Sequence, residues 1–331
     1  MCDADDFDFT VFDTLLEETP GVDAFCSSSA WSESARRAFM PNAPLVVYEH
    51  DGAMAVFAQE RMPDGQTMLL PLDATWTLGC PLASAHPQRN IDGLIGRIAD
   101  DYPHVDFIML SGMRPTSAIY RVSYNALLKR NLAAVNFKPA DRCIATIYDG
   151  VEAWFARRSS KFRASVRRAL RDAESANIRF ETLDPASITA DVMQDFYHVE
   201  RRSWKGLSGT GIAEKGMATF CQSLLEATAP RGQTRVILAY EGNECVGFIF
   251  GAVFQKRYRG VQMSVDHRFR NIGLGNVLQI KMIEALADEG VLAYDLGSAM
   301  PYKMRWADIR DRTVSVLVGP LRPPGAARHI P

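Results

Sequence analysis

A glycine-containing segment in the C-terminal half, Arg270-Asn271-Ile272-Gly273-Leu274-Gly275-Asn276, has the composition of a phosphate-binding turn. Glycines let main-chain N–H groups converge on an anion, and a helix that begins at such a turn adds the positive end of its dipole. Arg270 supplies a fixed positive charge. The segment has neither the Gly-x-Gly-x-x-Gly spacing of a dinucleotide site nor the spacing of a Walker A loop. It therefore indicates a different phosphate-containing ligand, the alternative being an ordinary tight turn.

The elements around this segment follow a fixed order. Spacing and turn residues in the second half predict helices, a hairpin, a strand, a helix and a strand. These are expected over residues 157–176, 191–204, 216–227, 235–254, 258–265, 274–287 and 291–296. Because the hairpin precedes the glycine-containing turn, the sheet is not the doubly wound parallel type.

The first half offers a similar order of elements. Asp51-Gly52 separates two apolar runs, which is a strong hairpin signal, and a buried-strand run at 105–110 lies between helical stretches at 91–98 and 118–132. We therefore predict an α/β (α+β) protein with two divergent copies of one fold, residues 1–149 and 150–331.

Composition and charge narrow the class of protein. With 47% hydrophobic and 23% charged residues, disorder is excluded. Residues 1–150 hold 11 Lys and Arg against 20 Asp and Glu, and the remaining residues hold 26 against 19. The cationic half is expected to meet an anion, unless the two halves neutralise each other.

Several features indicate a cytoplasmic protein without a metal. The six cysteines form no CxxC pair, and the N-terminal residues are acidic rather than basic and apolar. No apolar stretch is long enough to span a bilayer. The histidines are scattered, and no His/Cys/Asp group has zinc spacing.

The pattern Arg270-x-x-Gly273-x-Gly275, after a hairpin and a strand and before a helix, resembles motif A of the GNAT acyl-CoA N-acyltransferase superfamily. Four stretches together resemble its CelD-like acetyltransferase branch: 160–170, 200–204, motif A, and 295–297 with 302–306. The sequence departs from that pattern at Glu200, where a His is usual. The first half resembles the family only in its order of elements, as in the Fem-type peptidoglycan transferases, which have two GNAT-like domains in tandem.

The resemblance implies two tandem GNAT-like domains, each a twisted, mostly antiparallel sheet flanked by helices. A split between the strands at 258–265 and 292–296 would hold acetyl-CoA or another acyl-CoA as cosubstrate. Main-chain groups of Met263 and Val265 would pair with the pantetheine amides. The groups implied to hold the pyrophosphate are Arg270 and the N–H groups of Asn271, Ile272, Gly273, Leu274, Gly275 and Asn276.

Acyl transfer to an amine requires that the amine lose a proton and that the leaving thiolate gain one. Asp266 and His267 end the strand beside the implied thioester, so each is a candidate base, although an Asp in this place is often a cap. Tyr302 lies where the superfamily often carries a tyrosine acid. The alternative for Tyr302 is packing against Trp306.

Three residues after the last predicted strand are candidates for binding the acceptor. Lys303 and Arg305 would share one face of an extended segment and hold an anionic acceptor. Ser298 would bond an acceptor hydroxyl. The alternatives are solvated charges for the first two and a structural turn for Ser298.

A basic helix is predicted in the second half, with seven Lys and Arg and no acidic residue over 157–171. An apolar stripe indicates that one side is packed. The basic side indicates a phosphate-rich ligand such as CoA, a solvated face, or RNA. Fem-type transferases take their acyl group from aminoacyl-tRNA and usually carry a long helical hairpin in the second domain. No heptad-patterned insertion is present here, which favours acyl-CoA over tRNA.

The sequence thus predicts an acyl-CoA-dependent acyltransferase of the N-acetyltransferase type, with a small-molecule or glycan acceptor. The resemblance suggests an amine on an amino sugar or cell-envelope glycan precursor. One alternative is a Fem-type aminoacyl-tRNA-dependent transferase. The other is a non-catalytic ligand-binding protein that kept the fold.

Overall fold

The computed structural model describes residues 7–100, 105–137 and 139–320. The chain divides into two units, Met1–Ala140 with Arg312–Pro331, and Asp141–Asp311. This division differs from the expected one at residues 149 and 150. Strand β7 (Ala140–Thr146) pairs with β12 (Ala293–Ser298), and β13 (Ile309–Val318) pairs with β5 (Phe107–Met113). Long-range strand pairing therefore decides which unit each segment joins.

The first unit has a sheet covered by helices. Its helices are α1 (Thr10–Glu18), α2 (Ala24–Ser27), α3 (Ser29–Phe39), α4 (Pro87–Asp100) and α5 (Ala118–Lys129). Its other strands are β1 (Leu45–His50), β2 (Ala53–Arg61), β3 (Thr67–Leu70), β4 (Leu82–Ser84) and β6 (Ala134–Asn136). Strands β1, β2, β3, β5 and β13 lie side by side in this order, and β4 pairs with β2 and β6 with β13. Strands β3 and β5 pair in parallel, whereas the pairs β1–β2, β2–β3, β2–β4, β5–β13 and β6–β13 are antiparallel.

The predicted hairpin of the first unit is confirmed. His50 pairs with Ala53 across the turn, and Asp51 and Gly52 both have positive φ, 46° and 73°. This is the turn geometry that an Asp-Gly pair favours, because glycine adopts positive φ without a steric penalty.

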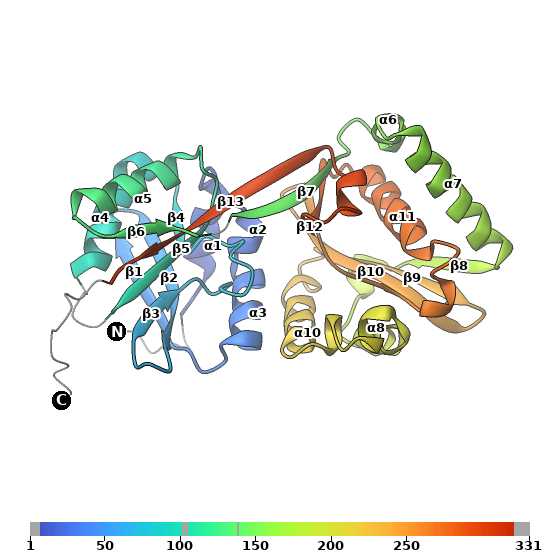
Figure 1. Ribbon diagram of the computed structural model, residues 1–331, viewed down its shortest axis with the longest axis horizontal. Coiled ribbons are helices and arrows are strands. Elements are labelled where there is room, and N and C mark those ends of the chain that lie inside the picture. The colour runs from blue at the N-terminus through green and yellow to red at the C-terminus, as the bar shows by residue number, and fades with distance from the viewer. Residues whose placement is uncertain (1–6, 101–104, 138, 321–331) are drawn as a thin grey trace. The chain divides into compact units, whose positions relative to one another are not determined.

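The second unit has a sheet of the order β7-β12-β11-β10-β9-β8. Its remaining strands are β8 (Ile178–Thr182), β9 (Thr234–Glu241), β10 (Glu244–Phe254) and β11 (Arg257–Val265). Its α-helices are α6 (Val151–Ala156), α7 (Ser160–Ser175), α8 (Val192–Arg202), α9 (Trp204–Leu207), α10 (Met217–Thr228) and α11 (Leu274–Asp288). Short 3₁₀ turns are η3 (Pro185–Ser187), η4 (Gly211–Ala213), η5 (His267–Phe269) and η6 (Lys303–Arg305). Figure 1 shows α7 and α11 on one face of this sheet and α8 and α10 on the other.

The helix predicted over 157–176 is divided in the structure. The Ser159 side chain accepts a hydrogen bond from the Phe162 N–H and caps α7, which separates α7 from α6. Phe162, Val166 and Ala169 are buried on the α7 face toward α11. The predicted apolar stripe is therefore confirmed, and burial of one such aromatic side chain contributes roughly 2–3 kcal/mol to stability.

The α/β (α+β) fold class is confirmed for both units, each a mostly antiparallel sheet flanked by helices. Among the described helices, none combines the length and the apolar character needed to cross a bilayer.

Candidate functional site

In the second unit, the parallel strands β11 and β12 separate after three residue pairs, of which the last joins Arg259 to Asp295. Beyond it, β11 stays paired with β10 as far as Val265. A Cβ on Gly260 would lie only 2.8 Å from the Tyr294 ring, so the glycine makes room for that ring in the opening. The split implied by the resemblance is therefore present.

A cavity of about 350 Å³ lies in this split. Its lining residues come from β10, β11, β12, α9, α11 and the η6 region: Trp204, Lys205, Ile249, Gly260, Val261, Gln262, Met263, Gln279, Tyr294, Leu296, Tyr302, Lys303 and Trp306. The volume is within the range of small-molecule sites. No Asp or Glu is among the described residues that line it.

The glycine-containing turn adjoins this cavity. Gly273, with φ of 73°, caps α11, and a Cβ on Gly275 would lie 3.4 Å from the Met263 side chain, which lines the cavity. Within the described part of the chain, no group accepts a hydrogen bond from the N–H of Asn271, Ile272, Leu274 or Gly275. The first N–H groups of a helix have no intrahelical acceptor, so these donors are available to water or to an anion.

The other residues of the turn are placed as follows. Arg270 is exposed, the Leu274 side chain is buried in the core, and Asn276 donates its N–H to the Gly273 carbonyl at 2.8 Å. On β11, Met263 and Val265 pair with β10 in register and are half-buried. The turn and β11 thus lie next to one another, as the interpretation of motif A requires.

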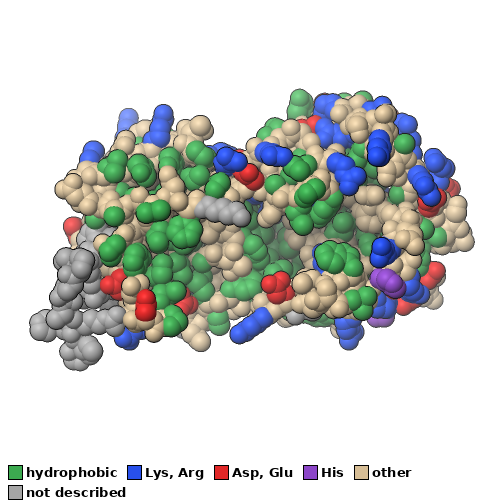
Figure 2. Space-filling view, in the orientation of Figure 1, with side chains coloured by type: hydrophobic (Ala, Val, Ile, Leu, Met, Phe, Trp, Pro, Cys, Tyr) green, Lys and Arg blue, Asp and Glu red, His purple; other side chains and the backbone are tan. Residues whose placement is uncertain are grey.

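The basic helix α7 lies against the turn. A Cβ on Gly273 would be 3.1 Å from the Ala169 side chain of α7. The exposed cations of α7 are Lys161, Arg167, Arg168 and Arg171. Figure 2 shows Lys and Arg side chains gathered over this part of the second unit.

Asp266 and His267 do not line the cavity. Asp266 is 1% exposed and caps η5, and its carboxylate accepts hydrogen bonds from Arg202 Nε at 2.6 Å and Arg268 Nη2 at 3.0 Å. Burial by itself would raise the pKa of Asp266, but the hydrogen bonds from Arg268 and Arg202 outweigh burial and lower it. His267 is exposed on η5.

Tyr302 does line the cavity, at the start of η6. Burial and the nearby Cys143 raise the pKa of its hydroxyl, so Tyr302 keeps its proton at neutral pH. Trp306, its predicted packing partner, stacks on Trp154 with ring centroids 5.8 Å apart.

The expectation of an extended segment with Lys303 and Arg305 on one face is wrong. The two residues lie in the 3₁₀ turn η6, where side chains two apart point in different directions. Lys303 lines the cavity, whereas Arg305 is exposed and lies outside it. Ser298 is exposed at the end of β12, also outside the lining.

Residues 160–304 match the family model described as an acetyltransferase (GNAT) domain. The second unit is a GNAT domain. No curated protein matches the chain.

Several solved structures are similar to this chain over most of its length. FemX has a TM-score of 0.68 at 10% identity, over 93% of this chain and 96% of that one. L-PGS from Bacillus licheniformis has a TM-score of 0.57 at 11% identity, over 94% of this chain and 91% of that one. A tandem GNAT protein from the clavulanic acid biosynthesis pathway has a TM-score of 0.52 at 13% identity, over 97% of each chain. These likenesses show the fold, which is two GNAT-like domains in tandem.

The segment 200–204 places α9 at the cavity of the GNAT domain. Arg202 binds Asp266 and also donates to the Cys245 carbonyl at 2.9 Å, and the Ser203 side chain caps α9. These contacts bring Trp204 and Lys205 to the cavity wall. Sequence reasoning identified the segment but missed Lys205, the residue that follows it.

Lys205 is a further polar group of this wall, and Glu200 lies behind it in contact with Gln262, which also lines the cavity. Lys205 Nζ donates to the Met263 carbonyl at 2.8 Å. Glu200 is 2% exposed, and its Oε1 accepts from the Ile212 N–H at 3.0 Å and from Gln262 at 3.3 Å. No hydrogen-bond partner of Glu200 Oε2 is found among the described residues. A sequence signal existed only for Glu200, as the departure from the family's usual His.

Within the described ranges, no cluster of His, Cys, Asp and Glu could hold a metal ion.

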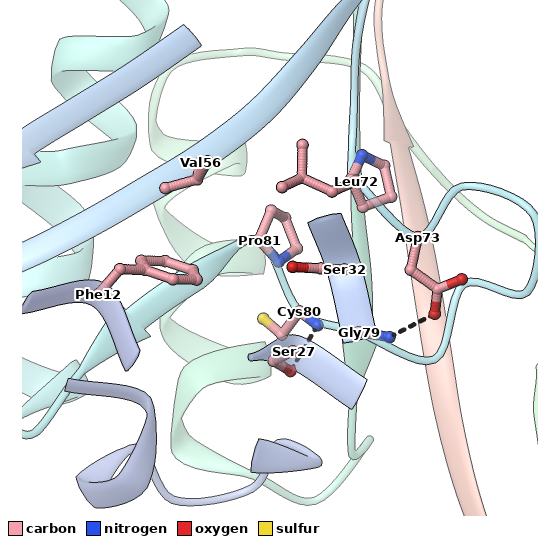
Figure 3. A pocket seen from close by; sticks show the side chains of 10 residues that line it. Phe12, Ser27, Ser32, Val56, Leu72, Asp73, Gly79, Cys80 and Pro81 are labelled. Carbon is pink, nitrogen blue, oxygen red and sulfur yellow. Dashed lines mark hydrogen bonds between the residues drawn. The ribbon is translucent and has the colours of Figure 1, made fainter. Parts of the chain in front are cut away.

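The first unit has a buried carboxylate, Asp73, shortly after β3, as the second unit has Asp266 directly after β11. Figure 3 shows Asp73 accepting a hydrogen bond from the Gly79 N–H. The cavity lined by Asp73 holds about 10 Å³, which is room for no more than about one water.

Proposed function

We propose that the GNAT domain transfers an acyl group from an acyl-CoA, of which acetyl-CoA is the simplest, to an amine. The observation that carries the proposal is the cavity between β11 and β12 next to a turn with four N–H donors that lack a protein acceptor. A pantetheine arm fits a split between strands, and a pyrophosphate fits the turn.

The chain's own residues support this chemistry at the cavity. β11 presents main-chain groups to the split. One of them, the Met263 carbonyl, already accepts a hydrogen bond from Lys205 Nζ. Tyr302, whose hydroxyl is protonated at neutral pH, is the proposed donor of a proton to the leaving thiolate, and the proton released by the attacking amine passes to solvent. The proposed acceptor is an amine on a small molecule or glycan, which rests on the resemblance. We also propose that the protein is located in the cytoplasm.

The test is a thermal-shift measurement with CoA and acetyl-CoA. A ligand that binds only the folded state raises the melting temperature, and the rise increases with ligand concentration. Arg270→Ala combined with Gly275→Ala is expected to reduce the shift, because it removes the charge and crowds the N–H donors. Arg257→Ala, on the exposed start of β11, is the matched control and should leave the shift unchanged.

If neither CoA nor acetyl-CoA shifts the melting temperature, the donor assignment is contradicted. If CoA species bind but thiol release is absent with every amine tried, a ligand-binding role is favoured over catalysis.

A second candidate is transfer from aminoacyl-tRNA, and the exposed cations of α7 beside the turn favour it. Binding of tRNA through phosphate contacts would weaken steeply with salt. A filter-binding series at rising salt with Arg167→Ala and Arg171→Ala tests this. Weak, salt-independent retention of tRNA would eliminate this candidate.

A further inference from the structure

We propose that the cavity of the GNAT domain binds a carboxylate or phosphate group of a substrate between Lys205 and Lys303. The inference rests on the proposed function for the reaction but adds the chemical class of the substrate. It replaces the expected pair Lys303 and Arg305 with two lysines from different elements.

The geometry places two ammonium groups in one cavity wall. Lys205 comes from α9 and Lys303 from η6, and both line the cavity. Over the described residues, no Asp or Glu lies within ion-pair distance of either ammonium group. Lys205 Nζ donates a hydrogen bond to the Met263 carbonyl at 2.8 Å. The wall therefore carries two ammonium groups without a direct ion-pair partner among the described residues, and Glu200 and Asp295 act on them only at longer range.

A third cation lies at the Lys303 end of the cavity. A Cβ on Gly297 would be 3.2 Å from Lys303 Nζ and 3.7 Å from Arg259 Nη2, so these groups surround one point of β12. Asp295 is the carboxylate beside these cations, and it pairs with Arg259 itself. It binds Arg142 and Arg259 at 2.7 Å each and accepts the Gly297 N–H at 2.8 Å.

The surroundings of the two lysines make the charged forms costly without a ligand. The pKa of Lys303 is lowered to about 8, chiefly by burial and also by Arg259 and Lys205, while Asp295 and Cys143 oppose the shift. Burial also lowers the pKa of Lys205, against the opposing effect of Glu200 and Cys221. An anion between the lysines would offset both burial and mutual repulsion, so binding would raise their pKa values.

The anionic group has two possible sources, which the experiment separates. It belongs either to the acyl part of the donor, as in the CoA ester of a dicarboxylic acid, or to the acceptor. The probes are acetyl-CoA, succinyl-CoA, inorganic phosphate and succinate.

The experiment is titration calorimetry at pH 8 in two buffers of different ionisation enthalpy, with the full chain. Anion binding is expected to take up a fraction of a proton, because the pKa of Lys303 rises from about 8. Tighter binding of succinyl-CoA than acetyl-CoA assigns the site to the donor. Binding of phosphate or succinate to the acetyl-CoA complex assigns it to the acceptor.

Three variants test the assignment to Lys303. Lys303→Met should weaken anion binding by about tenfold or more and abolish the proton uptake. Lys303→Arg should keep anion binding but lose the proton uptake, because arginine stays charged at pH 8. Lys215→Met, an exposed lysine outside the cavity, is the control and should change neither.

The inference and the proposed function fail in different ways. Proton-linked binding of free phosphate or succinate that depends on Lys303, without any binding of CoA, would support the anion site and contradict the proposed function. Binding of CoA with no proton uptake from any anionic probe, and no preference for succinyl-CoA, would overturn the anion site alone.

Discussion

The two units share an order of strands but differ where a parallel pair meets. In the first unit, β3 and β5 pair at Met68 and Leu69, and the cavity after β3 holds about 10 Å³. In the second unit, β11 and β12 separate around a cavity of about 350 Å³. Of these two cavities, the one in the second unit is of ligand size, whereas the one after β3 has room for no more than about one water. Function here depends on side chains at the split and not on the fold alone.

Buried carboxylates show a second difference between the units. Asp73 accepts hydrogen bonds from the main-chain N–H groups of Leu78 and Gly79, and burial raises its pKa to about 6. Asp266 is held by Arg202 and Arg268, and its pKa is lowered in spite of burial. The pKa of Asp73 is therefore raised with neutral hydrogen-bond donors, and that of Asp266 is lowered by charged partners. Their contributions to the free energy of unfolding are thus expected to change with pH in opposite directions.

Filling the split between β11 and β12 with a larger side chain should have the largest effect on acyl-CoA affinity. Val261 lines the cavity, and Val261→Trp would fill part of it, making the second unit resemble the first. We expect acyl-CoA affinity to fall about 100-fold or more, measured by calorimetry. Val135→Trp, on an exposed residue of the first unit, is the control. Unchanged affinity of Val261→Trp would mean that the donor binds elsewhere.

Removal of the Asp266 charge should destabilise the second unit. Asp266→Asn removes the buried carboxylate that Arg202 and Arg268 share, while both arginines keep Glu244 as a partner. Because the two guanidinium groups are partly exposed, the cost is roughly 2 kcal/mol. The free energy of unfolding in urea measures this loss. Because the pKa of Asp266 is lowered, its contribution is present above the ordinary pKa and is lost as pH falls through the folded value. A loss independent of pH down to acid conditions would contradict the ion-pair account.

The pH dependence of Asp73 should have the opposite sign. The folded-state pKa of about 6 exceeds the ordinary value of 3.8, so the folded state favours the protonated form. Stability from this group is full below 3.8 and decreases as pH rises toward 6, by on the order of 2–3 kcal/mol. The destabilisation caused by Asp73→Asn should therefore be smaller at pH 7 than at pH 5. Equal destabilisation at both values would remove the claimed difference between the units.

The smallest effect on stability is expected on the surface of α7. Arg168 Nε is 3.4 Å from Asp172 on the exposed side, and such a pair contributes about 0.3–0.5 kcal/mol. Arg168→Ala should change the melting temperature little. A strong loss of tRNA binding in this variant, without a change in CoA binding, would favour the second candidate function.

The sequence predicted the local elements and missed what distant contacts decide. The hairpin at Asp51-Gly52 and the order of β9 to β12 follow from turn residues and apolar spacing, and both are confirmed. The unit boundary depends on pairing of β7 and β13 with strands far along the chain, which no local pattern reveals.

The candidate site shows the same limit. Tyr302 and Lys303 were identified and line the cavity. Lys205 was missed because Arg202 and Ser203 bring α9 to the cavity through contacts with β10 and β11. Asp266 attracted attention as a candidate base, but its neighbours are two arginines that only the folded chain brings together.

Hydrogen exchange measured with and without CoA tests the central claim most directly. The account predicts that CoA protects the main-chain N–H groups of 260–265 and 271–275 in the second unit. It predicts no change over 67–70 and 107–110, which belong to the parallel strands β3 and β5 of the first unit. Protection confined to the first unit, or bound CoA without protection of either segment of the second, would contradict the account.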